Sequence, residues 1–253
     1  NGSVCMWGVS WSGFNALQMA MRRPPALKTI IAVHASDDLY QDDVHYFGGV
    51  AHLDPYHLFI NHELALPATP DYRLDERYML ERFEQKPWLF TYLNQQLDGD
   101  FWRRKSLREN YAAIDIPVFL IGGLLDGYRS ACARMFENLE VPVKIEIGPW
   151  DHSCPDDGSP GPNHEWMDEA IKWCRYYLQG VDNGTRREMS KGKQLTAFVR
   201  AGHEPDTALA EAPGKWRRFN WPVQNGSWLK LYPAVDNRLA RSCRRAAKDR
   251  LEY

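Results

Sequence analysis

A serine between two glycines, placed where a strand-like segment meets a helix-like one, constrains this chain more than any other feature. Residues 3–9 are small and β-prone, and residues 14–21 carry apolar side chains at helical spacing. Residues 8–13 read Gly-Val-Ser-Trp-Ser-Gly, a close variant of the G-x-S-x-G turn that presents a nucleophilic serine. Glycine suits both flanks because strand and helix approach too closely there for a Cβ atom. The motif predicts an exposed Ser10 Oγ and a Trp11 amide that faces a developing oxyanion.

The segments that follow alternate between helix and strand patterns. Residues 28–35 form a short, β-branched and almost entirely apolar run, typical of a strand buried on both faces. With the first strand and the helix between them, this run makes one βαβ unit of a parallel sheet. Further strands are expected at residues 116–123 and 142–148, and further helices at residues 129–139 and 163–178. The sequence therefore predicts an α/β catalytic domain over residues 1–180.

A long, mainly helical insertion separates two of these strands, over about residues 45–110. Residues 57–65 and 74–83 look amphipathic, and residues 87–97 are rich in aromatic side chains. An insertion of this length is too large for a simple crossover, so we expect a helical cap over the site. The alternative is a helical subdomain that does not contact substrate.

The pattern changes near residue 180. Residues 181–193 are polar and contain glycine, which is typical of a linker. From residue 194 onward, short β segments are separated by Pro, Gly and Asn. Residues 194–253 are therefore expected to form part of a β-sandwich domain.

Composition narrows the classes of partner. A net charge of −2 offers no strong field for nucleic acid or an anionic membrane, and no apolar run is long enough for a membrane span. The five cysteines are scattered without metal-ligand spacing, which favours reduced thiols and a cytoplasmic setting. We expect no metal and no other cofactor, and homo-oligomerisation stays open.

Two polar residues follow later strands at positions that could complete a serine-based site. Asp126 follows the strand at 116–123, and His152 follows the strand at 142–148. The carboxyl ends of parallel strands meet at one edge of a sheet. The order Ser10, Asp126, His152 is that of an α/β hydrolase. We therefore expect Ser10 as nucleophile, His152 as general base and then acid, and Asp126 as the group that orients the imidazole.

Other residues compete for the acid. Asp37 and Asp38 follow the strand at residues 28–35, and either could take the place of Asp126. His34 lies inside that buried strand and is predicted to be a hydrogen-bonded core histidine. The acidic loop itself could also bind a substrate ammonium through Asp38 and Asp42. The alternative is a solvated loop with turn-capping aspartates.

Three segments together resemble the active-site signatures of a known family. Residues 8–13, 122–128 and 148–152 are similar to those of the CocE/NonD hydrolases. This Xaa-Pro dipeptidyl-peptidase-like group includes the cocaine esterase, the α-amino acid ester hydrolases and the glutaryl acylases. The likeness extends to residues 24–28 and 37–40, and to residues 195–221 as the opening of a second domain.

The resemblance implies an α/β-hydrolase core, a helical cap and a C-terminal jelly-roll, galactose-binding-like domain. It places the triad on Ser10, Asp126 and His152, and the first oxyanion donor on the Trp11 amide. In the family, the turn that carries the nucleophilic serine is called the nucleophile elbow, which corresponds to residues 8–13 here. The family's second oxyanion donor is a tyrosine on a loop before the elbow, so no residue of this chain can be named for it. By the same comparison, the early strands of the sheet are expected to precede residue 1, and the jelly roll is expected to be cut short.

The implied activity is cleavage of an ester or amide bond through an acyl-enzyme on Ser10. Small esters, amides and short peptides are the expected substrates. An acyltransferase or amidase could use the same triad with a different acyl acceptor. A non-catalytic binding protein on the same fold is the alternative from another class.

Overall fold

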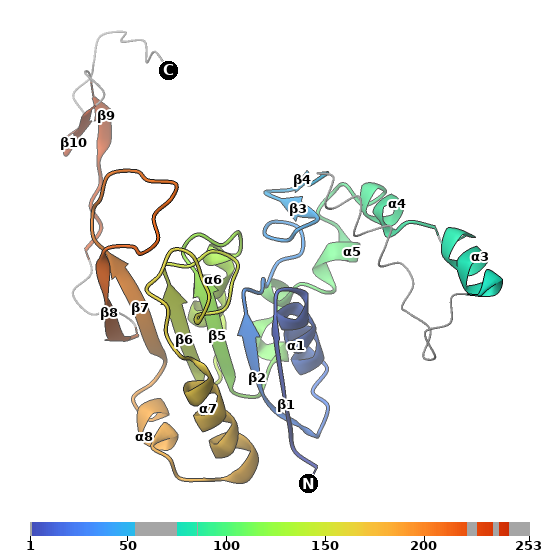
Figure 1. Ribbon diagram of the computed structural model, residues 1–253, viewed down its shortest axis with the longest axis horizontal. Helices are drawn as coiled ribbons and strands as arrows, with labels where there is room; N and C mark the ends of the chain where they lie inside the picture. The colour runs from blue at the N-terminus through green and yellow to red at the C-terminus, as the bar shows by residue number, and fades with distance from the viewer. Residues whose placement is uncertain (1, 54–74, 85, 222–226, 235–237, 243–253) are drawn as a thin grey trace. The chain divides into compact units, whose positions relative to one another are not determined.

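A six-stranded, mostly parallel β-sheet organises the main part of the chain (Figure 1). The computed structural model describes residues 2–53, 75–84, 86–221, 227–234 and 238–242. The chain divides into two compact units, residues 1–221 and residues 222–253. The sheet lies in the first unit, with its strands in the order β1-β2-β5-β6-β7-β8. Their bounds are Val4–Val9, Leu27–Val33, Val118–Gly123, Val143–Gly148, Gln194–Arg200 and Gly214–Asn220.

Helices connect the parallel strands of this sheet (Figure 1). No helix in the described ranges combines the length and the apolar character that crossing a bilayer requires. The bounds of the connecting helices are Trp11–Met21 for α1, Arg129–Asn138 for α6, Met167–Gln179 for α7 and Thr185–Met189 for α8.

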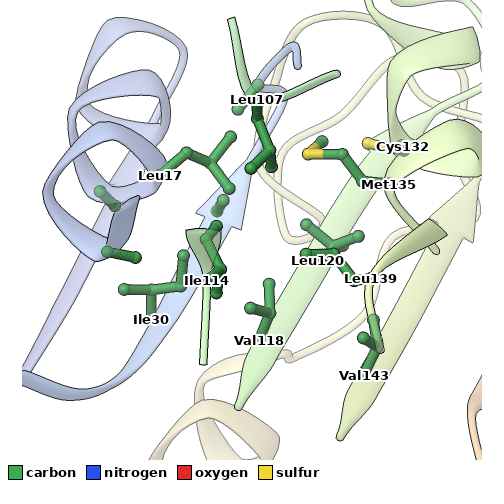
Figure 2. Packing of buried hydrophobic residues seen from close by; sticks show 14 of the residues in the cluster. Leu17, Ile30, Leu107, Ile114, Val118, Leu120, Cys132, Met135, Leu139 and Val143 are labelled. Atoms are coloured by element: carbon green, nitrogen blue, oxygen red, sulfur yellow. The ribbon is translucent and has the colours of Figure 1, made fainter. Parts of the chain in front are cut away.

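Side chains of the central strands alternate between two buried clusters. Ile30 of β2 belongs to a cluster that also holds Leu17 of α1 and Met135 of α6 (Figure 2). The next residue, Ile31, belongs to a second cluster with Trp173 of α7. This period of two is the pattern of a strand whose two faces are both buried. Residues 28–35 are almost entirely apolar because helices pack against both faces of this strand.

The insertion between β2 and β5 is built from short elements. The helix predicted at residues 74–83 corresponds to α3, and the aromatic segment at residues 87–97 contains α4. The helix predicted at residues 57–65 lies outside the described residues. That the insertion caps the site stays a prediction. The bounds are Tyr46–Phe47 for β3, Val50–Ala51 for β4, Glu76–Glu84 for α3, Trp88–Leu93 for α4, Asp100–Arg103 for α5, Leu107–Glu109 for η1 and Tyr111–Ala113 for η2.

An aromatic core holds part of this insertion together. Tyr40, Tyr46 and Trp102 are all buried in it. The rings of Tyr40 and Tyr46 stack with centroids 5.2 Å apart, and Trp102 lies 4.9 Å from Tyr46. The Tyr40 hydroxyl donates to the Gln96 carbonyl, and the Tyr46 hydroxyl donates to the Tyr92 carbonyl. The aromatic richness of this region thus has a packing role.

The last two strands of the sheet lie where a separate β domain was predicted. β7 pairs in parallel with β6, and β8 pairs antiparallel with β7. The first unit therefore continues to Trp221, and residues 181–193 contain α8 instead of a bare linker. Short β segments do not reveal which sheet they join. Here α7 and α8 supply the crossover that parallel pairing with β6 requires.

The second unit contains one pair of short strands among its described residues. β9 (Tyr232–Ala234) and β10 (Arg238–Ala240) pair antiparallel, with Ala240 facing Tyr232. The described residues of this unit do not show the β-sandwich domain predicted for residues 194–253.

Candidate active site

Ser10 lies at the turn between β1 and α1, in a backbone conformation that few residues adopt. Its φ is 57° and its ψ is −123°, and it caps the N-terminus of α1. A positive φ at a residue with a Cβ is strained, and such strain is concentrated at functional sites. The Ser10 amide donates to the Val33 carbonyl at 2.9 Å, so the end of β2 holds the turn in place.

The flanking glycines are required by close approach. A Cβ at Gly8 would lie 2.2 Å from Ser12 Cβ and 2.6 Å from the Ser12 carbonyl carbon. A Cβ at Gly13 would lie 3.0 Å from both Ala35 Cβ and the Val33 oxygen. At Gly8 this is the approach of strand and helix expected from the sequence, whereas at Gly13 the nearest atoms belong to the end of β2 and the residues after it.

The amide of Trp11 opens α1, an 11-residue helix. Amides in the first turn of a helix have no acceptor within the helix, and the helix dipole places partial positive charge at this end. An oxyanion formed beside Ser10 could therefore accept a hydrogen bond from Trp11. The geometry suits the donor role predicted from the sequence.

Asp126 lies in the turn that follows β5, with an exposure of 2%. Two backbone hydrogen bonds join this turn to the end of β6 and the loop after it: Leu124 donates to Gly148 at 2.9 Å, and Leu125 donates to Trp150 at 2.9 Å. A Cβ at Gly123 would lie 2.3 Å from the Trp150 oxygen, so only glycine permits this approach. The two loops are thus fixed to each other by their backbones.

His152 contacts Asp126 directly. Its Nδ1 lies 2.8 Å from Oδ1 of Asp126, and its side chain is 44% exposed. Burial favours the neutral carboxyl, but hydrogen bonds from His152 and from His34, together with their charges, hold the pKa of Asp126 at about 2. An ionised carboxylate only accepts hydrogen bonds, so Nδ1 of His152 donates. The neutral ring then keeps its lone pair on Nε2, where it can accept a proton.

His34 is a second histidine on the same carboxylate, and sequence reasoning missed this contact. Its Nδ1 lies 2.9 Å from Oδ2 of Asp126, and its Nε2 lies 2.6 Å from the Ser153 carbonyl oxygen. The sequence predicted a hydrogen-bonded core histidine, which is what the structure has, but not its partners. A usable signal existed, since His34 directly follows β2 and therefore lies at the same sheet edge as Asp126 and His152.

The same three side chains satisfy a distance criterion for metal binding. One ligand atom from each of His34, Asp126 and His152 lies within 4.8 Å of the others. In this arrangement, however, each carboxylate oxygen of Asp126 already faces an imidazole nitrogen at hydrogen-bond distance. The distances are those of a histidine–aspartate–histidine hydrogen-bond chain, which needs no ion to hold it.

The competing acids are occupied elsewhere. Asp37 accepts hydrogen bonds from the Tyr111 hydroxyl and from Arg134, whose Nη2 lies 2.6 Å from Oδ1. Asp38 accepts from the amides of its own turn and from Arg108. Asp126, by contrast, is hydrogen-bonded to His152. The geometry therefore favours Asp126 as the acid.

The carboxylates suggested for a substrate ammonium also have cationic partners. Asp38 is almost fully buried and paired with Arg108, and Asp42 lies 2.5 Å from Nη2 of Arg134. Each of these carboxylates thus already has an arginine partner, and Arg134 also pairs with Asp37 while Arg108 also pairs with Asp98. The loop therefore has the arrangement of a structural ion-pair network.

A cavity of about 400 Å³ begins beside the elbow. Trp11 and Phe14 of α1 line it, together with Trp88, Tyr92 and Phe101 from the insertion. Pockets of this size that combine apolar walls with a few polar groups are typical of small-molecule sites. The aromatic residues of the insertion thus contribute to a cavity that Trp11, the residue after Ser10, also lines.

Comparison with known proteins gives both family and fold matches. Residues 1–154 match the X-Pro dipeptidyl-peptidase (S15) family. Two curated relatives, each named a putative Xaa-Pro dipeptidyl-peptidase, come from Bacillus cereus and Bacillus anthracis. They are 26% and 25% identical over 167 residues, which is 61% of this chain and 27% of each relative. The chain therefore spans about a quarter of the length of these relatives.

Several solved structures share the fold. A CocE/NonD family hydrolase from Staphylococcus aureus superposes with a TM-score of 0.65 at 15% identity, over 96% of this chain and 39% of that one. An aminopeptidase from a marine sediment Thaumarchaeota archaeon gives 0.62 at 18% identity, over 96% and 43%. An α-amino acid ester hydrolase gives 0.58 at 19% identity, over 96% and 43%. At these identities the likeness concerns the fold alone.

Proposed function

The chain belongs to the X-Pro dipeptidyl-peptidase (S15) family, and from this membership we propose that it forms the catalytic core of a serine hydrolase. The proposed reaction is cleavage of an ester or an amide bond through an acyl-enzyme on Ser10. One observation carries the proposal: the 2.8 Å contact between His152 Nδ1 and Asp126 Oδ1. This contact pairs the base His152 with the acid that orients it, at the same sheet edge as the turn that carries Ser10.

The proposed mechanism assigns one task to each group. Ser10 Oγ attacks the substrate carbonyl carbon while Nε2 of His152 takes the hydroxyl proton. The amide of Trp11 donates a hydrogen bond to the oxyanion that forms. The intermediate collapses, His152 protonates the leaving alcohol or amine, and the acyl group stays on Ser10. Water then attacks the acyl-enzyme by the same route and releases the acid.

The aromatic cavity supports a substrate with an apolar group next to the scissile bond. In this proposal the backbone amide of Trp11 donates to the oxyanion. The same residue lines the cavity, so the cavity begins close to the scissile bond. The names of the Bacillus relatives indicate peptides cleaved after an Xaa-Pro pair. We propose small apolar esters, amides and short peptides of this kind as the substrate class.

We further propose that residues beyond 222 open the jelly-roll domain that the family resemblance implies. The separation of residues 222–253 as a compact unit and the antiparallel pair β9–β10 support this assignment. Limited proteolysis of the whole protein tests it, with cleavage expected close to residue 222. Protection of that segment together with cleavage inside β7 would contradict it.

A fluorophosphonate probe tests the nucleophile in the whole protein. The probe should label Ser10, and Ser10→Ala should abolish labelling. Ser12→Ala, two residues away in the same turn, is the matched control and should leave labelling in place. A folded protein without label on Ser10 would show that the nucleophile is wrongly assigned. Product analysis with water against an added amine or alcohol separates hydrolysis from acyl transfer.

A further inference from the structure

The buried histidine at the end of β2 has acceptors on both sides of its ring. Nδ1 of His34 faces Oδ2 of Asp126, and Nε2 faces the carbonyl oxygen of Ser153. A carbonyl oxygen cannot donate, and neither can an ionised carboxylate. Both ring nitrogens must therefore donate, which requires a proton on each. The ring is then a cation, although none of its surface is exposed.

A buried cation needs a compensating charge, and Asp126 supplies it. Nδ1 and Oδ2 are 2.9 Å apart, the distance of a charge-assisted hydrogen bond. His34 and Asp126 thus form a buried ion pair, and His152 contacts the free side of the same carboxylate.

The backbone holds His34 in an uncommon conformation that sets this contact. Its φ is 47°, in the left-handed region, although it is not a glycine. Its amide still donates to the Ile121 carbonyl at 2.9 Å, so the residue remains attached to β5. Non-glycine residues held in this region persist only where the surroundings over-determine them. At His34 the hydrogen bonds on both sides of the ring, to Asp126 and to Ser153, hold the residue in this conformation.

His34 bridges two loops that come from different strands. Asp126 belongs to the loop after β5, and Ser153 directly follows His152 in the loop after β6. The rings of His34 and His152 have centroids 5.2 Å apart, so they flank the carboxylate. Removing the His34 ring would free one carboxylate oxygen and one carbonyl, both in the two loops that the proposed mechanism uses.

We propose that His34 is a positioning residue of this site: a buried imidazolium that holds Asp126 by its second oxygen and ties it to the loop carrying His152. This inference rests on the proposed function. The titratable groups around the His34–Asp126 pair are His152 from the loop after β6, the thiol of Cys132 on α6, and the hydroxyl of Tyr128, whose ring centroid lies 5.5 Å from that of His152. Burial raises the pKa of Cys132 to about 12 and that of Tyr128 still further, so both groups are neutral. On the same loop as His34, Asp37 is paired with Arg134.

The charge of the His34 ring can be measured in the unaltered protein, so this test does not depend on a variant that folds poorly. In the whole protein labelled with 15N-histidine, we expect the His34 ring to carry a proton on both nitrogens at pH 7.5. The signal should be absent in His34→Gln and present in His164→Gln, which removes a histidine–carboxylate pair outside the site. A His34 ring with one protonated nitrogen would overturn the proposal. So would a signal that changes on addition of a chelator, since that indicates a metal.

The positioning role can be measured by the rate of fluorophosphonate labelling. His34→Ala should lower the rate roughly 10- to 100-fold, the range for losing one hydrogen bond to a charged group. His34→Gln should recover part of that loss because its amide can still donate to Oδ2 of Asp126. His164→Gln should label at the original rate.

The pH profile separates positioning from a purely structural role. A cationic His34 disfavours a proton on His152. Its removal in His34→Ala and in His34→Gln should therefore move the acidic limb of the labelling profile to higher pH, by roughly 1 pH unit. Folded His34→Ala with an unchanged rate and profile would overturn the proposal. If Ser10 of the unaltered protein takes no label, the proposed function fails instead, and the nitrogen signals still decide the charge of His34.

Discussion

Nδ1 of His152 lies 2.8 Å from Oδ1 of Asp126, although the two residues follow different strands of the sheet. Backbone hydrogen bonds from Leu124 to the end of β6 and from Leu125 to the loop after it hold the two segments together. The pair therefore depends on the register of β5 against β6, in which Gly123 faces Gly148.

Replacing Asp126 with asparagine should remove the orienting acid with little change in shape. The amide group of Asn can present a donor to Nδ1 of His152, which would put the ring proton on the wrong nitrogen. We expect labelling or ester hydrolysis to fall roughly 10³- to 10⁴-fold, as for the corresponding change in a known serine protease. Asp115→Asn, at a half-exposed aspartate paired with Arg23, is the control. An active Asp126→Asn enzyme would exclude Asp126 as the acid.

The same carboxylate should make stability depend on acid pH. Its pKa is about 2 in the folded protein against an ordinary 3.8, so the folded state binds the proton less readily than the unfolded chain. The contribution is complete above pH about 4 and is lost as the pH falls through 2. It should amount to about 2 kcal/mol. Urea unfolding of the unaltered protein and of Asp126→Asn at pH 5 and pH 2.5 should show roughly two thirds of this contribution as the difference between the two proteins. Parallel pH curves would contradict the ion pairs.

An alanine at position 8 should disrupt the elbow. Its Cβ would meet backbone and side-chain atoms of Ser12 well inside contact distance. We expect a loss of about 3 kcal/mol in the free energy of unfolding, together with slower labelling of Ser10. Gly202→Ala is the matched control, because a Cβ there meets nothing within 4 Å. Equal stability of the two variants would show that the turn can relax.

The aromatic cavity predicts a change in substrate binding. Trp88 lines the cavity but is about half exposed, so Trp88→Ala should cost little stability. We expect KM for an aromatic ester to rise roughly 10-fold, with kcat nearly unchanged, since burying an aromatic group contributes this order of free energy. Leu97→Ala, at a highly exposed apolar residue that does not line the cavity, should leave KM as it was. A fall in kcat alone would place the substrate elsewhere.

Much of the core could be predicted because its signals are local. The buried strand at residues 28–35, the glycines at 8 and 13 and the strand ends before Asp126 and His152 each leave a short sequence pattern. Their order along the chain indicated a parallel sheet with polar groups at one edge. The family resemblance is confirmed by the S15 match, and the fold by structures of the CocE/NonD type.

The features that sequence did not predict depend on contacts between distant segments. His34 and Asp126 are 92 residues apart, and the place of His34 at a strand end indicates its sheet edge but not which side chain it contacts. The arginines that pair with Asp38 and Asp42 come from η1 and α6. β7 was assigned to a separate domain because alternation shows that a strand forms but not which neighbour it pairs with.

A continuous run of backbone hydrogen bonds joins the loops of the site. Ser10 donates to Val33, His34 donates to Ile121, Leu124 donates to the last residue of β6, and Leu125 donates to the loop after β6. Each bond lies just beyond the regular strand pairing, where chain ends normally fray. Thermal motion at this edge should therefore displace the loops together and preserve the distances between them. These four amides should exchange their hydrogens with solvent as slowly as the interior of the sheet.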